Sequence, residues 1–198
     1  EDPEATARKV AEVLEMEYED VYARITKRAS FVWVKRKVDP EKARVLKELA
    51  LPGIDFTQES KRFYPKGNLA SHVLGFTGID SQGLGGVEVT FDKELRGIPG
   101  RIVVEFDARG RELPQAVHRY IPPQDGADLV LAIDEVIQFI AERELELAMA
   151  LTQADHGVVV VLQPRTGEVL ALANRPDYDP NSWEDYPSEM WRNTAISD

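Results

Sequence analysis

The sequence predicts an α+β protein, because helical and strand-like patterns are segregated along its 198 residues. Residues 1–53 show capped helical segments, and residues 54–125 show strand patterns interrupted by Gly and Pro. Residues 126–198 return to one long helix, which is followed by the two strands of a hairpin. We therefore expect a chain of three parts with these boundaries.

The first part is predicted to be a small helical head. Asp-Pro pairs at residues 2–3 and 39–40 indicate two helix starts, because Asp can cap free amides and Pro costs nothing in a first turn. The Pro-Gly pair at residues 52–53 closes the second of these helices. Between them, the segment SFVWV at residues 30–34 is rich in β-branched and aromatic side chains, which predicts a strand.

The second part is predicted to be rich in strands. The segment IDFTQESKRFYP, residues 54–65, alternates apolar and polar side chains as a half-buried strand does. A short helix is expected at residues 68–76, and another is expected to end at Gly97. Residues 100–114 are predicted to form a hairpin that turns at residues 108–110.

The third part combines a long helix with a two-faced strand. Residues 127–134 are predicted to be a strand that leads into a helix capped by Asp134, and residues 157–174 are predicted to be a hairpin. Alternate side chains of a strand point to opposite faces, so one face of its first strand carries Val158, Val160 and Leu162 and the other carries Val159 and Val161. The preceding helix can cover only one of these faces, so we expect the other to be left open.

Composition excludes several classes of function. The chain has 35 Asp and Glu against 24 Lys and Arg, a net charge of -11, which opposes binding to a nucleic acid backbone. It has no Cys, and therefore no disulfide framework, thiolate nucleophile or thiolate metal site. Its longest apolar run, residues 158–162, is far shorter than the roughly 20 residues of a membrane span, and no signal peptide opens it. We expect the chain as given to be soluble.

Two loops resemble ligand-binding motifs without completing them. The segment DYDPNS starts at Asp177 like a calcium loop, but its sixth and twelfth positions hold Ser182 and Ser188, so we expect a hydrated turn. The segment GLGGVE is similar to a phosphate-binding glycine loop, but its last position holds Glu88, which would repel phosphate. We interpret it as a structural turn.

The remaining candidates also have simpler explanations. His72, His118 and His156 lack metal-ligand spacing and are expected at the surface or as caps. The adjacent carboxylates of Glu184 and Asp185 do not converge on one bond as those of a glycosidase do, and are interpreted as hydrated.

The segment KRASFVWVKRKV that starts at residue 27 interleaves basic and aromatic side chains. It suits contact with anionic lipid headgroups, although the charged ends of an amphipathic strand explain it equally well. The residues themselves thus indicate no catalytic, cofactor-binding or metal-binding group.

Three longer segments resemble one known family. Residues 62–97 resemble the signature of the non-catalytic pedestal of class B penicillin-binding proteins. Residues 128–148 resemble the strand and first helix of their transpeptidase domain, and residues 157–181 resemble its first hairpin. The residues that carry the pedestal signature are Arg62, Tyr64, Pro65, Gly75, Asp80, Gly86 and Glu88.

The resemblance implies a fold and a role for each part. The chain would be an elongated pedestal with a helical head, joined to the opening helix and hairpin of a serine β-lactamase-like transpeptidase domain; residues 126–198 would be the truncated start of that domain. In the family, the serine of a Ser-x-x-Lys motif attacks the D-Ala-D-Ala end of a stem peptide, and Ser-x-Asn and Lys-Thr-Gly motifs follow. None of the three motifs occurs here, so we expect this chain to be catalytically inactive.

The resemblance also implies partners and a location. Family members carry a membrane helix and a further strand ahead of the matching residues, and they act in peptidoglycan synthesis on the extracytoplasmic face of the bacterial membrane. The expected partners are the remainder of the transpeptidase domain, a glycan polymerase of the SEDS family, other cell-wall synthesis proteins and a second copy of the chain. The alternative is a stand-alone interaction or dimerisation module that needs no transpeptidase domain.

One contact is predicted within the signature. Arg62 and Glu88 both lie in its most recognisable motifs, and a partly buried charge needs an opposite charge beside it. We therefore expect these two side chains to lie close together in the fold.

Overall fold

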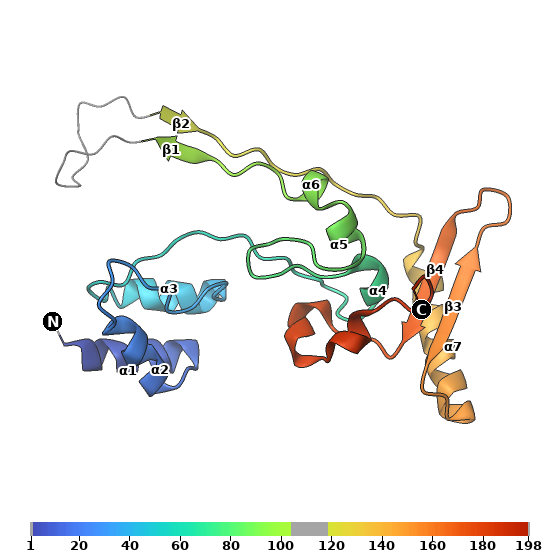
Figure 1. The fold of residues 1–198 in the computed structure, drawn as a ribbon, viewed down its shortest axis with the longest axis horizontal. Helices are drawn as coiled ribbons and strands as arrows, with labels where there is room; N and C mark the ends of the chain where they lie inside the picture. The colour runs from blue at the N-terminus through green and yellow to red at the C-terminus, as the bar shows by residue number, and fades with distance from the viewer. Residues whose placement is uncertain (1, 104–118, 198) are drawn as a thin grey trace. The chain divides into compact units, whose positions relative to one another are not determined.

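The computed structural model describes residues 2–103 and 119–197. It divides the chain into two compact units, Glu1–Lys61 and Arg62–Asp198. Helices and short antiparallel pairs of strands follow one another along the chain, which confirms the α+β class (Figure 1).

The first unit is built from three helices, α1 (Pro3–Leu14), α2 (Tyr18–Ile25) and α3 (Pro40–Glu48). Both predicted helix starts are confirmed. The carboxylate of Asp2 accepts hydrogen bonds from two amides in the first turn of α1, and that of Asp39 accepts one in α3. Each cap satisfies amides that have no partner within the helix, which typically stabilises the helix by about 1 kcal/mol.

The three helices share a small apolar core. Its side chains recur at helical spacing along α1, and one residue each from α2 and α3 completes it. The buried members are Ala7, Val10, Ala11, Leu14, Val21 and Leu46.

The strand predicted at residues 30–34 is wrong, because this segment is an irregular loop. None of the described residues up to Lys61 forms a strand, so the segment has no ladder to join. A strand depends on backbone hydrogen bonds to a neighbour, and a preference for β structure does not replace them. Hydrogen bonds from side chains to the backbone hold the loop instead.

The strand predicted at residues 54–65 is wrong for the same reason. The segment is extended but pairs with no other strand, and Tyr64 is its buried apolar residue. The alternating pattern that indicated a half-buried strand leaves Phe56 and Phe63 exposed.

Short helices open the second unit, as predicted. They are α4 (Ser71–Leu74), α5 (Gly86–Thr90) and α6 (Asp92–Leu95). The chain bends at Phe91, so the helix that was expected to end at Gly97 is divided into α5 and α6.

The segment GLGGVE turns the chain into α5, in keeping with its interpretation as a structural turn, and its Gly86 and the Gly75 that ends α4 allow these two helices to approach closely. Gly75 has a φ of 77°, and a Cβ atom there would lie 1.8 Å from the carbonyl oxygen of Gly85. Gly86 has a φ of 53°, and its Cβ would lie 2.4 Å from the carbonyl oxygen of Val73. A side chain at either position would therefore both clash with backbone and strain it.

The predicted hairpin is partly described. Strands β1 (Arg101–Val103) and β2 (Arg119–Ile121) pair antiparallel, with Ile102 opposite Tyr120. The turn predicted at residues 108–110 lies outside the described residues. The partner of β1 lies beyond residue 114, so the hairpin is longer than predicted.

The strand predicted at residues 127–134 is also wrong. This segment is irregular and largely exposed, and Val130 keeps 92% of its surface in contact with solvent. The segment pairs with no strand among the described residues, so its apolar pattern alone does not form a strand.

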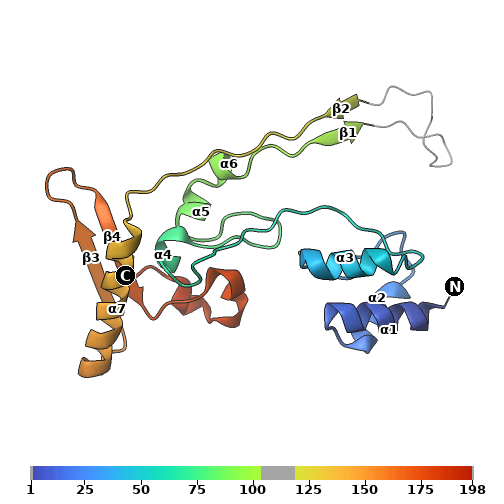
Figure 2. The same ribbon diagram turned by 180° about the vertical axis from the view of Figure 1, so that it is seen from behind.

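A long helix and a hairpin follow. Helix α7 (Glu135–Thr152) is capped by Asp134 as predicted, and strands β3 (Gly157–Leu162) and β4 (Val169–Arg175) form the predicted antiparallel hairpin. Figures 1 and 2 show α7 lying along one face of this hairpin. The short 3₁₀ helices η1 (Pro180–Asp185) and η2 (Ser188–Trp191) complete the chain.

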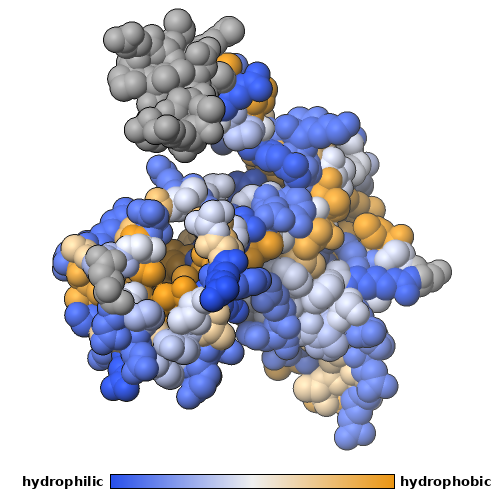
Figure 3. Space-filling view, turned by 60° about the vertical axis from the view of Figure 1, so that its left-hand side comes forward, coloured by the Kyte–Doolittle hydropathy of each residue, from blue (hydrophilic) through white to orange (hydrophobic). Residues whose placement is uncertain are grey.

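The hairpin has one covered and one open face, as predicted. Val159 and Val161 pack against a core that consists of Ala141, Leu145, Ala171 and Ala173. The outer face consists of Val158, Val160 and Leu162, which are 40%, 47% and 55% exposed. Figure 3 shows that apolar side chains also reach the surface elsewhere, between hydrophilic ones. No helix in the described part of the chain is both long enough and apolar enough to span a bilayer.

The outer face of the hairpin is predicted to drive self-association of the isolated chain. Burying one Val or Leu side chain contributes about 1.5–3 kcal/mol of favourable free energy. Covering three of them therefore offsets much of the entropic cost of association. Replacing both Val160 and Leu162 with Ser should lower the apparent mass in light scattering. Val130→Ser removes an exposed apolar side chain outside the hairpin and serves as the control. A strictly monomeric chain whose hairpin amides exchange slowly, with no companion polypeptide, would contradict the prediction.

Candidate functional site

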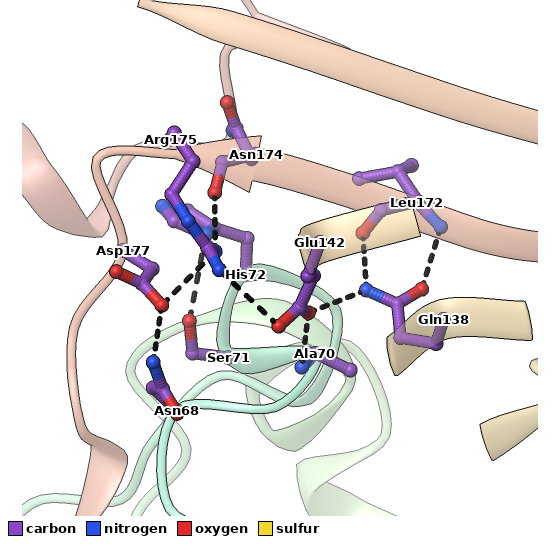
Figure 4. Close-up of polar contacts among 10 residues, drawn as sticks. All are labelled: Asn68, Ala70, Ser71, His72, Gln138, Glu142, Leu172, Asn174, Arg175 and Asp177. Atoms are coloured by element: carbon purple, nitrogen blue, oxygen red, sulfur yellow. Dashed lines mark hydrogen bonds and ion pairs between the residues drawn. The ribbon is translucent and has the colours of Figure 1, made fainter. Parts of the chain in front are cut away.

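The candidate site is a buried polar junction within the second unit, where the residues around α4 meet α7 and β4. We use "the junction" for Asn68, Ala70, Ser71, His72, Gln138, Glu142, Leu172, Asn174, Arg175 and Asp177, which Figure 4 shows. Its side chains point toward one another from three elements that are far apart in sequence.

Helix α7 buries polar side chains and exposes apolar ones at its N-terminal half. Gln138 is fully buried and Glu142 is 7% exposed, whereas Val136, Phe139 and Ile140 are exposed. Gln138 and Glu142 are one turn apart, so both face the hairpin and α4. These two polar residues share the buried side of the helix with Ala141 and Leu145, and buried polar groups need internal partners.

The side-chain amide of Gln138 binds the outer edge of β4. Its Oε1 accepts a hydrogen bond from the backbone N–H of Leu172 at 2.7 Å, and its Nε2 donates to the carbonyl oxygen of Leu172 at 2.9 Å. Close by, the backbone N–H of Asp134 donates to the carbonyl oxygen of Leu170 at 2.8 Å. The start of α7 therefore occupies backbone groups of β4 that point away from β3.

The carboxylate of Glu142 is the centre of the junction. It accepts hydrogen bonds from Nε2 of Gln138 at 2.7 Å and from the backbone N–H of Ala70 at 2.8 Å. Ala70 has a φ of 56°, which is uncommon for a residue with a side chain. Nη2 of Arg175 lies 3.6 Å from Glu142 and completes the set of partners.

Arg175 connects this carboxylate to a second one. Its Nη1 lies 3.0 Å from the carboxylate of Asp177, which also accepts a hydrogen bond from Nδ2 of Asn68 at 2.5 Å. The side chain of Arg175 is only 11% exposed, so its charge needs both acids. Contacts from Arg175 at the end of β4, and from Asp177 two residues later, thus reach both α7 and the turn before α4.

An aromatic cluster adjoins the junction. Phe76 stacks on Trp183 with 4.7 Å between ring centroids, and it meets Tyr178 and Trp191 edge-on. The hydroxyl of Tyr178 donates to the carbonyl oxygen of Ser71 at 3.1 Å. Burial raises the pKa of Tyr178 to about 12, so this hydroxyl remains a neutral donor at physiological pH.

His72 is buried, which corrects the expectation that the histidines lie at the surface or serve as caps. Its Nε2 lies 2.9 Å from the carbonyl oxygen of Met190. Because a carbonyl oxygen can only accept, Nε2 carries the hydrogen and donates the hydrogen bond. Burial lowers the pKa of His72 and favours the neutral ring. His156 is exposed, and His118 lies outside the described residues.

Ser71 and His72 are the nearest approach to a nucleophile and a base. Oγ of Ser71 lies 3.5 Å from Nδ1 of His72, a long contact, and the serine is 1% exposed. A substrate has no access to such a hydroxyl, so the pair is structural.

No group of three His, Asp or Glu side chains in residues 2–103 and 119–197 is arranged to hold a metal ion. In the segment that was compared with a calcium loop, Asp177 binds Arg175 and Asn68, and Asp179 caps η1. Glu184 and Asp185 are exposed in η1. The polar groups of the site hold α4, α7 and β4 together.

The predicted contact between Arg62 and Glu88 is confirmed. Nε of Arg62 donates to Oε1 of Glu88 at 2.8 Å and Nη2 donates to Oε2 at 3.2 Å, a bidentate pair. The hydroxyl of Tyr64 donates to the same carboxylate at 3.3 Å. The backbone of Tyr64 also exchanges two hydrogen bonds with the side chain of Asn181, which connects this part of the chain to η1.

The other signature residues lie apart from that contact. Gly75 and Gly86 meet where α4 and α5 approach each other, whereas Pro65 and Asp80 are exposed in turns. The role of the seven residues as a family signature stays a prediction.

The sequence interpretation missed Gln138, Glu142 and Arg175. The available signal was two polar residues four apart on a helix that was expected to cover an apolar strand. That signal is weak, because polar residues at helical spacing are usually solvated. Arg175 is the last residue of β4, and no sequence pattern marks it as a partner of Glu142.

The ion pair of Arg62 and Glu88 is predicted to stabilise the second unit. Because Arg62 is 42% exposed and solvent screens it, each replacement with Ala should lower the free energy of unfolding by about 1 kcal/mol. The double variant should lose about 0.5 kcal/mol less than the sum of the two. The same set of single and double Ala variants at Lys66 and Glu135, an exposed pair 2.5 Å apart, should change the free energy of unfolding almost additively in urea denaturation. Strict additivity at Arg62 and Glu88 would count against the contact.

His72 is predicted to make the second unit less stable in mild acid. Because its pKa is lowered in the fold, the unfolded chain binds the proton first as the pH falls below about 6.5. The free energy of unfolding should then fall by up to about 1.4 kcal/mol per pH unit until the folded ring is also protonated. Urea denaturation between pH 7.5 and 5.5, followed by the fluorescence of the adjoining tryptophans, measures this slope. His72→Gln should remove the slope and His156→Gln should keep it; an unchanged slope in the first variant would refute the assignment.

Comparisons with known proteins agree with this architecture. Residues 1–131 match the family model of the penicillin-binding protein dimerisation domain, and residues 157–198 match that of the penicillin-binding protein transpeptidase domain. The chain is 40% identical over 200 residues to the stage V sporulation protein D of Bacillus subtilis, covering 99% of this chain and 31% of that protein. It is 40% identical over 193 residues to the peptidoglycan D,D-transpeptidase FtsI of Escherichia coli, covering 96% of this chain and 32% of that protein.

A solved structure shows the same fold. The peptidoglycan synthetase of Bifidobacterium adolescentis superposes with a TM-score of 0.61 at 28% identity, covering 92% of this chain and 34% of that one. The chain spans about a third of the length of the curated relatives that it matches. With two thirds of its residues under the first family model, the chain belongs to the penicillin-binding proteins and comprises their dimerisation domain and the start of their transpeptidase domain.

Proposed function

We propose that this chain is the non-catalytic pedestal, with the opening elements of the transpeptidase domain, of a peptidoglycan D,D-transpeptidase that acts in bacterial cell-wall synthesis. The observation that carries the proposal is the junction, in which buried polar contacts join residues matched by the dimerisation model to α7 and to residues matched by the transpeptidase model. A relative at 40% identity, FtsI of E. coli, bears the name of that activity.

The proposed role of the chain is mechanical. The pedestal holds the first helix and hairpin of the transpeptidase domain through Glu142 and Arg175, and the open face of β3 receives the rest of that domain. In this proposal residues 1–53 are the helical head, residues 54–125 the rest of the pedestal, and residues 126–198 the start of the transpeptidase domain.

The same proposal assigns partners and a location. The parent acts at the extracytoplasmic face of the bacterial membrane and contacts a SEDS-family glycan polymerase through its pedestal. The support for this polymerase is the resemblance of residues 62–97 to the family signature. Self-association is supported by the name of the matched model, a dimerisation domain, and by the open face of the hairpin.

The reactive serine is proposed to lie in a part of the parent that this chain does not include. Ser71, which lies beside His72, is buried, and the sequence contains no Ser-x-x-Lys. The chain should therefore form no covalent adduct with a fluorescent penicillin, because acylation needs an activated nucleophile.

Gel labelling tests this directly. The chain should give no fluorescent band, whereas the longer product of its gene and the FtsI protein of E. coli, run alongside, should give one. A labelled band from the chain alone would show that the nucleophile assignment is wrong. A longer gene product that contains no Ser-x-x-Lys and takes no label would favour the alternative, a stand-alone dimerisation module.

A further inference from the structure

We propose that the loop of residues 24–37 in the first unit is a docking site for an anionic lipid surface, with Phe31 and Trp33 as the side chains that insert. This inference does not depend on the proposed function, because it rests on the charge, exposure and hydrogen bonds of one loop. We call this segment the aromatic loop.

The aromatic loop is locally basic, although the protein as a whole is acidic. Between Asp20 and Asp39 the chain has six basic residues and no Asp or Glu, although its net charge is -11. The six are Arg24, Lys27, Arg28, Lys35, Arg36 and Lys37. Since the whole chain is repelled by an anionic surface, only a local concentration of positive charge makes such a contact favourable.

Three of these cations hold the loop in place. Nη1 of Arg24 donates to the carbonyl oxygen of Val34 at 2.6 Å, and Nζ of Lys35 donates to that of Leu14 at 2.9 Å. Nε of Arg36 donates to the carboxylate of Glu59 at 2.9 Å. The loop is therefore tied to α1, to α2 and to the segment that follows α3, although its residues 26–37 belong to no helix or strand.

The held loop keeps two large rings in solvent. Phe31 is 60% exposed and Trp33 is 43% exposed, and their rings meet edge-on with 4.9 Å between centroids. The guanidinium of Arg36 lies 5.4 Å from the centroid of the Trp33 ring. Leaving two adjacent aromatic side chains in water loses much of the stabilisation that their burial provides, so their exposure indicates a partner.

Lys27 and Arg28 supply charge beside the rings. Both are exposed, and neither forms an ion pair with any of the residues that the structure describes. Their side chains extend from the same loop and are available to phosphate groups.

A lipid surface fits these features better than an acidic protein does. The interfacial region of a bilayer presents anionic headgroups above an apolar layer, and Trp with flanking Lys or Arg is typical of residues at that depth. Residues 26–37 have no regular secondary structure with which a protein ligand would pair. Two neighbouring rings and long basic side chains suit a fluid surface that adapts to them.

Vesicle sedimentation with the full chain tests the proposal. Binding is expected to vesicles of equal parts phosphatidylglycerol and phosphatidylcholine, at least tenfold weaker binding to phosphatidylcholine alone, and loss of binding in 0.5 M NaCl. The double variant Phe31→Ser, Trp33→Ser should bind the anionic vesicles at least tenfold more weakly. The double variant Lys27→Glu, Arg28→Glu should show a similar loss.

Matched variants distinguish the contribution of the loop to vesicle binding from that of the rest of the chain. Lys9→Glu with Lys93→Glu makes the same change in net charge at two exposed lysines outside the loop, and Phe63→Ser removes another exposed ring. Both controls should bind within threefold of the original chain. The fluorescence of Trp33 should shift to shorter wavelength with anionic vesicles, and Trp33→Phe should remove that shift.

Several results would overturn the proposal. These are no binding to the anionic vesicles, unchanged binding by the Phe31 and Trp33 variant, and an equal loss in the controls. Association with an acidic protein that depends on Phe31 and Trp33, without any binding to vesicles, would show that the loop serves a protein partner and would also refute the lipid assignment.

Discussion

The arrangement of the second unit depends on one buried carboxylate. A carboxylate that leaves water without partners is strongly destabilising, so Glu142 can be buried only where hydrogen-bond donors converge on it. Those donors come from the start of α4, from α7 itself and from the end of β4. Each of these elements is thereby held at one position relative to the other two, and a shift of any one would leave the charge unsatisfied.

The neighbouring contacts follow the same logic with smaller consequences. Without Glu142 and Asp177, Arg175 would be a buried cation with no opposite charge beside it. Arg62 and Glu88 form a second ion pair of this kind, in which the carboxylate is the more buried partner. Around these charges, the aromatic cluster and the glycine contact of α4 with α5 fill space without specifying direction. Packing brings the elements together, and the directional polar contacts select their register.

Local sequence signals predicted local structure well. The sequence predicted the caps of α1, α3 and α7 correctly, and also the hairpin with its two faces. Each of these features depends on residues that are close together in the sequence. The three strands that were predicted wrongly depended instead on partners elsewhere in the chain. The contact of Arg62 with Glu88 was predicted from the family signature. The roles of Gln138 and Glu142 were not predicted, because they depend on α7 turning these polar side chains toward the interior. Sequence periodicity does not reveal that orientation when both faces of a helix carry apolar residues.

The amide of Gln138 has a consequence for how the sheet can be extended. A two-stranded sheet has two free edges, and each is a template on which another strand can add. On β4 the backbone groups of Leu172 are taken by the side chain of Gln138, and the carbonyl of Leu170 is taken by the amide of Asp134. That edge is therefore closed to a further strand, whereas no other segment among the described residues hydrogen-bonds to the outer edge of β3. The sheet is asymmetric in its capacity to grow, so a chain that adds a strand, whether native or misassembled, must do so beside β3.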